Sequence, residues 1–203
     1  VDIRHNFLEK LDLLKDAGTT IVEKSFAYAD YLVPTYYILT TAEASTNLSR
    51  YDGVRYGYRS KQSESLDSMY VNTRTEGFGD EVKRRILLGT YVLSEGFYDA
   101  YFTKAQQVRR LIREEVDRVL EEVDYILLPN STRMPWTIGD ADDDPVSVYL
   151  SDMYTVLANI AGVPALAVPN GQNDDGMAYG IQIISKKWAE HEMLDFARSL
   201  KSM

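Results

Sequence analysis

The chain has 203 residues, of which 45% are hydrophobic, and carries a formal net charge of -9. That apolar content is sufficient for a packed core and excludes an intrinsically disordered chain, while the negative charge disfavours direct binding to a nucleic-acid backbone. The absence of cysteine excludes thiolate nucleophiles, cysteine metal sites and a fold built on disulfides. No stretch approaches the roughly 18 apolar residues of a membrane span, so no membrane partner is expected.

The first part of the chain predicts two helices and a long loop. Leu8, Leu11 and Leu14 recur at helical spacing, and Gly18 is a plausible stop before a short strand at 20–22. Pro34 suits a first helical turn, so a buried helix is expected over 35–48. Residues 50–72 are polar and rich in serine, which predicts a long loop.

The middle of the chain predicts two long helices. Gly79 or Asp80 suits the start of a helix that runs to about residue 102. Residues 105–123 place their apolar side chains along one stripe, and Glu114 with Arg118 suggests an ion pair across one turn of the opposite face.

The last part alternates strands with helices. Strands are expected over 125–128, 163–168 and 179–185, with the last two separated by a turn at 170–176. Residues 130–143 are expected to form a loop, Asp144 and Pro145 suit the start of a helix to about Ala161, and a final helix is expected over 190–200. This alternation predicts the α/β class, with a mixed, mainly parallel sheet flanked by helices.

Asp152 is the first candidate binding residue, because it falls among apolar neighbours within the helix expected after Pro145. A carboxylate on an apolar face is costly unless a cation or hydrogen-bond donors satisfy it. Two interpretations remain: a structural ion pair or helix-terminus contact, and a site for a ligand's ammonium group.

Three successive cations, Lys83, Arg84 and Arg85, cannot share one face of a helix, so at least one points inward or along a cleft. The periodicity does not choose between Arg84 and Arg85. Tyr36 and Tyr37 lie in the apolar helix at 35–48, where core packing and a binding role are both open. One inward arginine, Asp152 and a tyrosine would suit a zwitterionic amino acid, although the sequence does not show that they meet.

Two further pairs of residues indicate structural rather than chemical roles. Glu43 and Asn47 are one helical turn apart and are expected to join a structural hydrogen-bond network. His5 and His191, the two histidines, lie in polar terminal surroundings and are interpreted as surface residues.

Several motifs together resemble the C-terminal half of the amidase-signature family. They lie at residues 43–53 (Glu-Ala-Ser-Thr-Asn-Leu, then Arg-Tyr-Asp-Gly), 81–101, 144–164 and 180–184, so the likeness covers essentially the whole chain. Within the family, the stretch 81–101 is most similar to the A subunits of tRNA-dependent amidotransferases. The departures are Asn130–Pro135, which contains Arg133 and is followed by Trp136, and Asn170, where many members have cysteine.

The resemblance implies that 1–203 is the C-terminal segment of a single amidase-signature domain whose N-terminal catalytic half is absent. That half would hold the Ser-Ser-Lys triad, so no catalytic residue is assigned in this chain, Ser45 and Ser49 included. Matching positions imply that Tyr36, Arg85 and Asp152 bind glutamine, which favours Arg85 over Arg84. Exposed apolar surface or self-association is also expected, since part of the core would be missing.

The resemblance also implies the setting of the reaction. The expected partners are the amidotransferase B and C subunits and glutamine, with tRNA contacted only through the complex, in the cytoplasm. No cofactor is expected in this chain, because ATP and magnesium would be used by the partner subunit. Two alternatives remain: part of another amidase-signature amide hydrolase, for which an apolar pocket would replace the charged residues, and a noncatalytic module that binds partner subunits.

Overall fold

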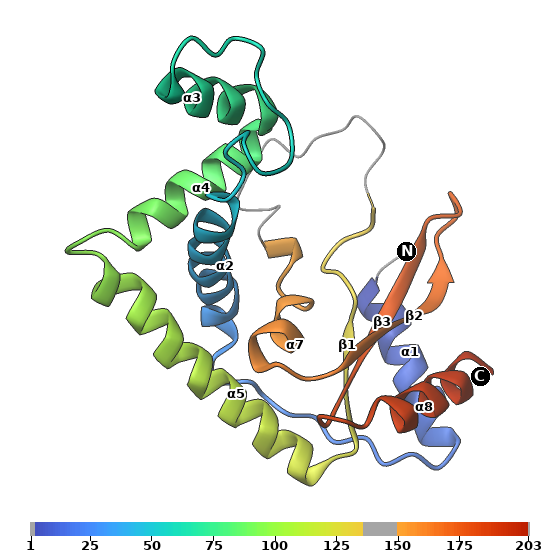
Figure 1. Cartoon of the computed structure of the whole chain (residues 1–203). Helices are drawn as coiled ribbons and strands as arrows, with labels where there is room; N and C mark the ends of the chain where they lie inside the picture. The colour runs from blue at the N-terminus through green and yellow to red at the C-terminus, as the bar shows by residue number, and fades with distance from the viewer. Residues whose placement is uncertain (1–2, 136–149, 203) are drawn as a thin grey trace. The chain divides into compact units, whose positions relative to one another are not determined.

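The computed structural model describes residues 3–135 and 150–202 (Figure 1). The chain divides into two compact units. The first comprises residues 1–33 and 109–203 and contains the sheet, and the second comprises residues 34–108 and is built from helices. In the described ranges, no helix is both long and apolar enough to cross a membrane.

Among the described residues, the sheet of the first unit has three strands, β1 (Tyr125–Pro129), β2 (Ala165–Gln172) and β3 (Ala178–Ser185), in the order β1-β3-β2. Both pairings are antiparallel. The α/β class is confirmed, but the expectation of a mainly parallel sheet is wrong for these strands. The connection from β2 to β3 is a hairpin turn at 173–177, too short for the crossover of a dozen or more residues that parallel neighbours require.

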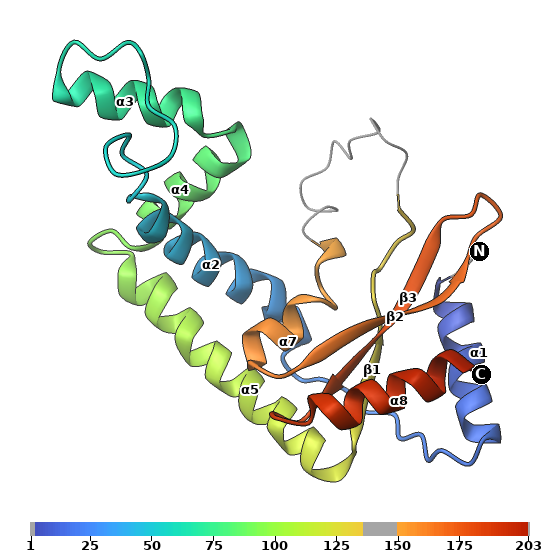
Figure 2. The same ribbon diagram turned by 45° about the vertical axis from the view of Figure 1, so that its right-hand side comes forward.

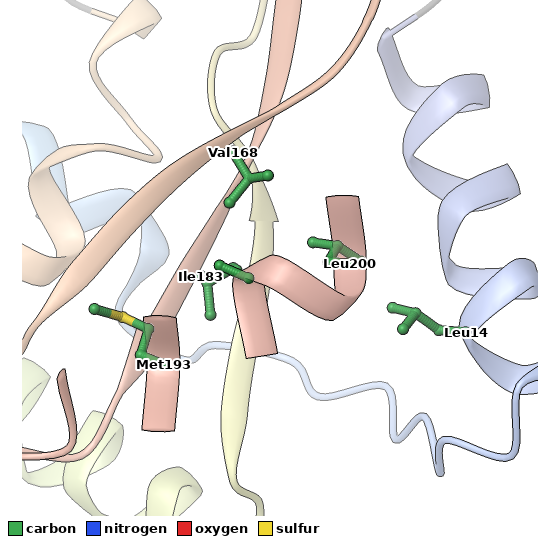
Figure 3. Close-up of a cluster of buried hydrophobic side chains, with 6 residues drawn as sticks. Leu14, Val168, Ile183, Met193 and Leu200 are labelled. Carbon is green, nitrogen blue, oxygen red and sulfur yellow. The ribbon is translucent and has the colours of Figure 1, made fainter. Parts of the chain in front are cut away.

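Helices α1 (Ile3–Asp16) and α8 (Glu190–Ser202) pack against this sheet (Figure 2). Figure 3 shows their shared core, in which Leu14 of α1 and Leu200 of α8 approach Val168 and Ile183 of the sheet. The strand expected at 20–22 is not present, because that segment has no regular secondary structure. Its Ile21 nevertheless packs against the core.

Helix α5 (Lys104–Glu122) matches its prediction to within one residue at each end. The apolar stripe is buried at Ile112, Val116 and Leu120, each at most 2% exposed. The predicted ion pair differs, since Glu114 pairs with Arg110 on the preceding turn, with 2.7 Å between Nε and Oε1, rather than with Arg118.

Helix α7 (Val156–Ala161) corresponds to the end of the helix expected to run from Asp144 and Pro145 to about Ala161. The expected start of that helix lies outside the described residues. Residues 152–155 form turns instead of continuing that helix. Gly162 ends α7 with a left-handed backbone at φ 71°, and its N–H donates to the Ala158 carbonyl.

The second unit contains most of α2 (Leu32–Leu48), which follows the short 3₁₀ helix η1 (Ala29–Tyr31), together with α3 (Leu66–Gly77), α4 (Asp80–Val92) and the π-helical turn η2 (Asp99–Thr103). The loop predicted over 50–72 is wrong from Leu66 onward, because Ser65 begins a helix with a capping box. The helix predicted from 80 to 102 is interrupted, because α4 ends at Val92 and Gly96 has a φ of 86°.

Helices α2 and α4 approach unusually closely at Gly89. A Cβ placed on this glycine would lie 2.6 Å from the carbonyl carbon of Thr41 and 2.7 Å from Cβ of Ser45. The Ser45 and Thr90 hydroxyls share a hydrogen bond of 3.0 Å beside this contact. Gly89 therefore sets the distance between the helices that carry Tyr36 and Arg85.

Candidate substrate-binding site

The second unit brings together two of the three predicted binding residues. Tyr36 and Tyr37 project from α2 with their rings edge to face, 5.3 Å apart at the centroids. The guanidinium carbon of Arg85, on α4, lies 5.8 Å from the Tyr37 ring centroid. This is a cation–π distance, so Arg85 lies against the tyrosine pair.

Glu81, one turn earlier on α4, anchors Arg85 with 2.9 Å between Oε1 and Nε. This hydrogen bond raises the pKa of Arg85 above its ordinary value, and the neighbouring Tyr37 and Tyr36 act in the same direction. The hydrogen bond from Arg85 likewise lowers the pKa of Glu81. The Arg85 side chain is still 40% exposed, so its charge is both oriented and accessible to a ligand.

Arg84 also pairs with Glu81, but its side chain is 67% exposed. Arg85 differs in its contact with the Tyr37 ring on the neighbouring helix. The structure therefore distinguishes Arg85 from Arg84, which the helical periodicity of the sequence does not. The position of Arg85 suits a binding role.

The residues expected to have structural roles form local hydrogen bonds. Asn47 Nδ2 donates to Glu43 Oε1 at 3.4 Å, as their spacing predicts. Ser49 donates to the Thr46 carbonyl at 2.6 Å, which suits a helix-end residue. His5 and His191 are confirmed as surface residues, with side chains 68% and 86% exposed.

Asp152 lies in the first unit, where it lines a pocket of about 480 Å³. The pocket is formed by α1, the end of β1 and its following segment, the turn before α7, and the β2–β3 hairpin. Its lining residues are Ile3, Asn130, Ser131, Arg133, Met134, Pro135, Ser151, Asp152, Thr155, Ala167, Val168, Pro169, Ala178, Tyr179 and Gly180.

The backbone at Asp152 is held by several hydrogen bonds. Its carbonyl accepts the N–H groups of Thr155 and Val156 at 3.0 and 3.1 Å. The buried Gln182 of β3 donates through Nε2 to the Tyr154 carbonyl at 2.9 Å, which attaches this turn to the central strand. Asp152 thus occupies a defined, half-buried position in the pocket wall.

Tyr36 and Arg85 belong to the second unit and Asp152 to the first. Their meeting in one site therefore stays a prediction, as does contact between Asp152 and an ammonium group. In the described ranges, no group of three or more acidic, histidine or cysteine side chains could hold a metal ion.

Sequence reasoning identifies Arg133 only as a departure from the family pattern, and the structure places it in the pocket with Asp152. Trp136, which follows the same segment, lies outside the described residues.

Tyr179 also lines this pocket, although the sequence does not indicate it as a binding residue. No periodicity identifies it, since its place in the pocket depends on the β2–β3 hairpin. Asn170, the other departure, donates to the Asn6 carbonyl of α1 at 3.2 Å.

Comparison with known proteins places this arrangement in a family. The family model described as amidase matches residues 1–194. The chain is 51% identical over 201 residues to the A subunit of the glutamyl-tRNA(Gln) amidotransferase of Prosthecochloris aestuarii, covering 99% of this chain and 42% of that protein. It is 52% identical over 193 residues to the protein of that name from Chlorobaculum parvum, covering 95% and 40%.

A solved structure gives the same result for the fold. The crystal structure of the A subunit of glutamyl-tRNA(Gln) amidotransferase from Thermotoga maritima superposes with a TM-score of 0.66 and 36% identity, over 93% of this chain and 36% of that chain. This chain spans about two fifths of the length of the curated relatives above. The similarity to the A subunits of tRNA-dependent amidotransferases is thereby confirmed, and the chain belongs to the amidase family.

Proposed function

We propose that this chain is the glutamine-binding part of the A subunit of a tRNA-dependent amidotransferase, which hydrolyses glutamine and supplies ammonia to convert Glu-tRNA(Gln) to Gln-tRNA(Gln). The observation that carries the proposal is identity of about half to relatives with that name along nearly the whole chain. The placement of Arg85 against Tyr37 and beside Tyr36 supports a binding role for this segment.

The chemistry of these residues suits the ends of an amino acid. Arginine offers five N–H donors in a planar fork that matches a carboxylate, and Glu81 engages Nε of Arg85. Asp152 would hold the α-ammonium group, and the Tyr36 hydroxyl would donate or accept a further hydrogen bond. Binding both ends of glutamine would fix its side-chain amide relative to a nucleophile, which is the positioning that covalent catalysis requires.

The proposal includes an incomplete catalytic site and a larger assembly. The nucleophile and its lysine would lie in the part of the relatives' length that this chain does not span, so 1–203 would be a C-terminal segment of one amidase-signature domain. The B and C subunits would be its partners in the cytoplasm. ATP and magnesium would be used by the partner that binds tRNA.

The test is glutamine hydrolysis by the full-length protein assembled with its B and C subunits, comparing wild type with Arg85→Ala and Asp152→Ala. Loss of a hydrogen bond to a charged group, about 1.5–3 kcal/mol, predicts a fall in kcat/KM of roughly 10- to 100-fold. Arg84→Ala is the matched control, since it removes a neighbouring cation that also pairs with Glu81.

Asp195→Ala is the corresponding control for Asp152, because Asp195 forms its ion pair on the exposed surface of α8. Both controls should turn over glutamine as wild type does. Unchanged turnover in Arg85→Ala and Asp152→Ala, with the complex intact, would mean that both residues have structural roles and do not bind glutamine. This segment would then belong to a hydrolase of another amide substrate, or it would have a noncatalytic role.

A further inference from the structure

We propose that Tyr37 is a positioning residue of this site, whose ring holds the guanidinium of Arg85 in the orientation that binds the α-carboxylate of the substrate. The inference rests on the proposed function, in which Arg85 binds that carboxylate. It concerns contacts within the second unit alone, because Tyr37 and Arg85 both belong to residues 34–108.

The guanidinium of Arg85 is contacted from two directions. Its carbon lies over the Tyr37 ring, 5.8 Å from the centroid, and its Nε donates to Glu81 Oε1 at 2.9 Å. A ring contact uses none of the five N–H donors of an arginine. Neither contact uses the two terminal nitrogens, whose N–H groups form a fork that matches a carboxylate. The ring and the carboxylate of Glu81 can therefore hold this side chain while it binds a ligand.

The packing of α2 on α4 brings the ring and the guanidinium together. Gly89 lies one helical turn after Arg85 on α4, and a Cβ on this glycine would lie 2.6 Å from the carbonyl carbon of Thr41. Thr41 lies one turn after Tyr37 on α2, and its hydroxyl donates to the Tyr37 carbonyl at 2.6 Å. The close approach at Gly89 thus fixes the backbone that carries Tyr37 relative to the backbone that carries Arg85.

The same ring contacts the other predicted binding residue of this unit. The rings of Tyr37 and Tyr36 have centroids 5.3 Å apart and planes at 86°, which is a favoured geometry for aromatic pairs. Both tyrosines are half-buried, whereas the Arg85 side chain is 40% exposed. An arginine has many rotamers, so a ring that favours one of them raises the fraction of molecules that are ready to bind. Tyr37 would in this way reduce the ordering that the substrate itself must impose.

The experiment compares hydrolysis of two substrates by the full-length protein assembled with its B and C subunits. The substrates are L-glutamine and 4-aminobutanamide, which has the amine and the amide but lacks the α-carboxylate. Tyr37→Leu should lower kcat/KM for glutamine by roughly 2- to 30-fold, the range of a cation–π contact, and leave the value for 4-aminobutanamide unchanged. Tyr37→Phe, which keeps the ring, should retain the wild-type preference for glutamine.

A double-mutant cycle measures whether Tyr37 acts through Arg85. In an Arg85→Ala background, Tyr37→Leu should lower kcat/KM for glutamine by less than about twofold, because the cation that the ring positions is gone. Two residues that act independently would instead give additive losses.

Tyr70→Leu is the matched control, since it removes a half-buried tyrosine ring from α3 of the same unit. It should match wild type for both substrates. If Tyr37→Leu unfolds at a lower temperature than wild type, Tyr37→Met replaces it in both comparisons, because methionine fills irregular space without a ring.

An unchanged kcat/KM for glutamine in Tyr37→Leu would overturn the inference. Equal losses for both substrates, or additive losses in the double mutant, would overturn it as well and indicate that the ring serves packing alone. The proposed function is judged separately, by glutamine turnover in Arg85→Ala and Asp152→Ala. A protein in which Arg85→Ala lowers turnover and Tyr37→Leu does not would keep the function and lose this residue.

Discussion

The close approach of α2 and α4 predicts that Gly89→Ala destabilises the second unit. The added methyl carbon would lie 2.6 Å from the Thr41 carbonyl carbon and 2.7 Å from Cβ of Ser45, and closer still to the Thr41 oxygen. Carbon atoms in favourable contact are about 3.5–4.0 Å apart, so the shortfall is roughly 1 Å. The obstacle is backbone, which cannot move aside by changing a rotamer.

Two effects of opposite sign determine how far Gly89→Ala changes the free energy of unfolding. Alanine is favoured over glycine inside a helix by about 1 kcal/mol, which would stabilise the variant if the space were open. Overpacking costs about 1–3 kcal/mol, and a clash with backbone belongs at the upper end of that range. We therefore expect a net loss of about 2 kcal/mol in the free energy of unfolding, with stretching of the Ser45–Thr90 hydrogen bond.

Urea unfolding followed by circular dichroism measures this loss as a lower midpoint. Gly79→Ala is the matched control, because this glycine precedes the same helix and its Cβ would meet nothing within 4 Å. Its expected change is below about 1 kcal/mol, the scale of an N-cap substitution. A Gly89→Ala protein as stable as wild type, or more stable, would refute the close approach of the two helices.

Three further outcomes follow from particular side chains. Gln182→Leu leaves the Tyr154 carbonyl without its donor, so thermal melting should show a loss of about 1–3 kcal/mol, with faster hydrogen exchange in the turn at 152–155. The hydrogen bond from Arg85 lowers the pKa of Glu81 below its ordinary value of 4.5. The ion pair therefore contributes to the free energy of unfolding in full above pH 4.5, and this contribution is lost as the pH falls through the lower pKa of the folded state. The urea midpoints of wild type and Glu81→Gln should therefore converge on acidification, and a constant difference would contradict the ion pair. Ser65→Ala should cost about 1 kcal/mol by removing the cap of α3, and an unchanged midpoint would exclude the cap's contribution.

The sequence predicts those helices whose own apolar spacing is clear. The stripe of α5 and the boundaries of α8 follow from apolar spacing, and α5 buries Ile112 and Val116 as that spacing requires. Helix α3 escapes prediction because its polar sequence lacks a clear stripe, although Ser65 followed by Ser68 is a readable cap signal. Strand direction is mispredicted because helix–strand alternation suggests crossovers, whereas the short 173–177 connection forces a hairpin.

The candidate site is predictable only in part, because contacts between elements that are distant in the sequence decide which of its residues come together. Arg84 and Arg85 both reach Glu81 on their own helix, and only packing against α2 brings Arg85 beside Tyr37. Arg133 is recognisable in the sequence as a departure from the family pattern, but its place in the pocket that Asp152 also lines depends on the pairing of β1 with β3. Leu87 of α4 is 71% exposed, while the expected apolar surface left by a missing part of the core, and self-association through it, remain predictions.

The order of the sheet has a consequence for how the chain is synthesised. Both β1 and β2 pair with β3, the last of the three strands to leave the ribosome, and β1 leaves it well before either of the others. A nascent chain must therefore carry β1 without this partner while α7 and β2 are translated. A stop codon before Ala178 would remove both described strand pairings at once, so an early termination that spares most of the chain would still eliminate the described sheet.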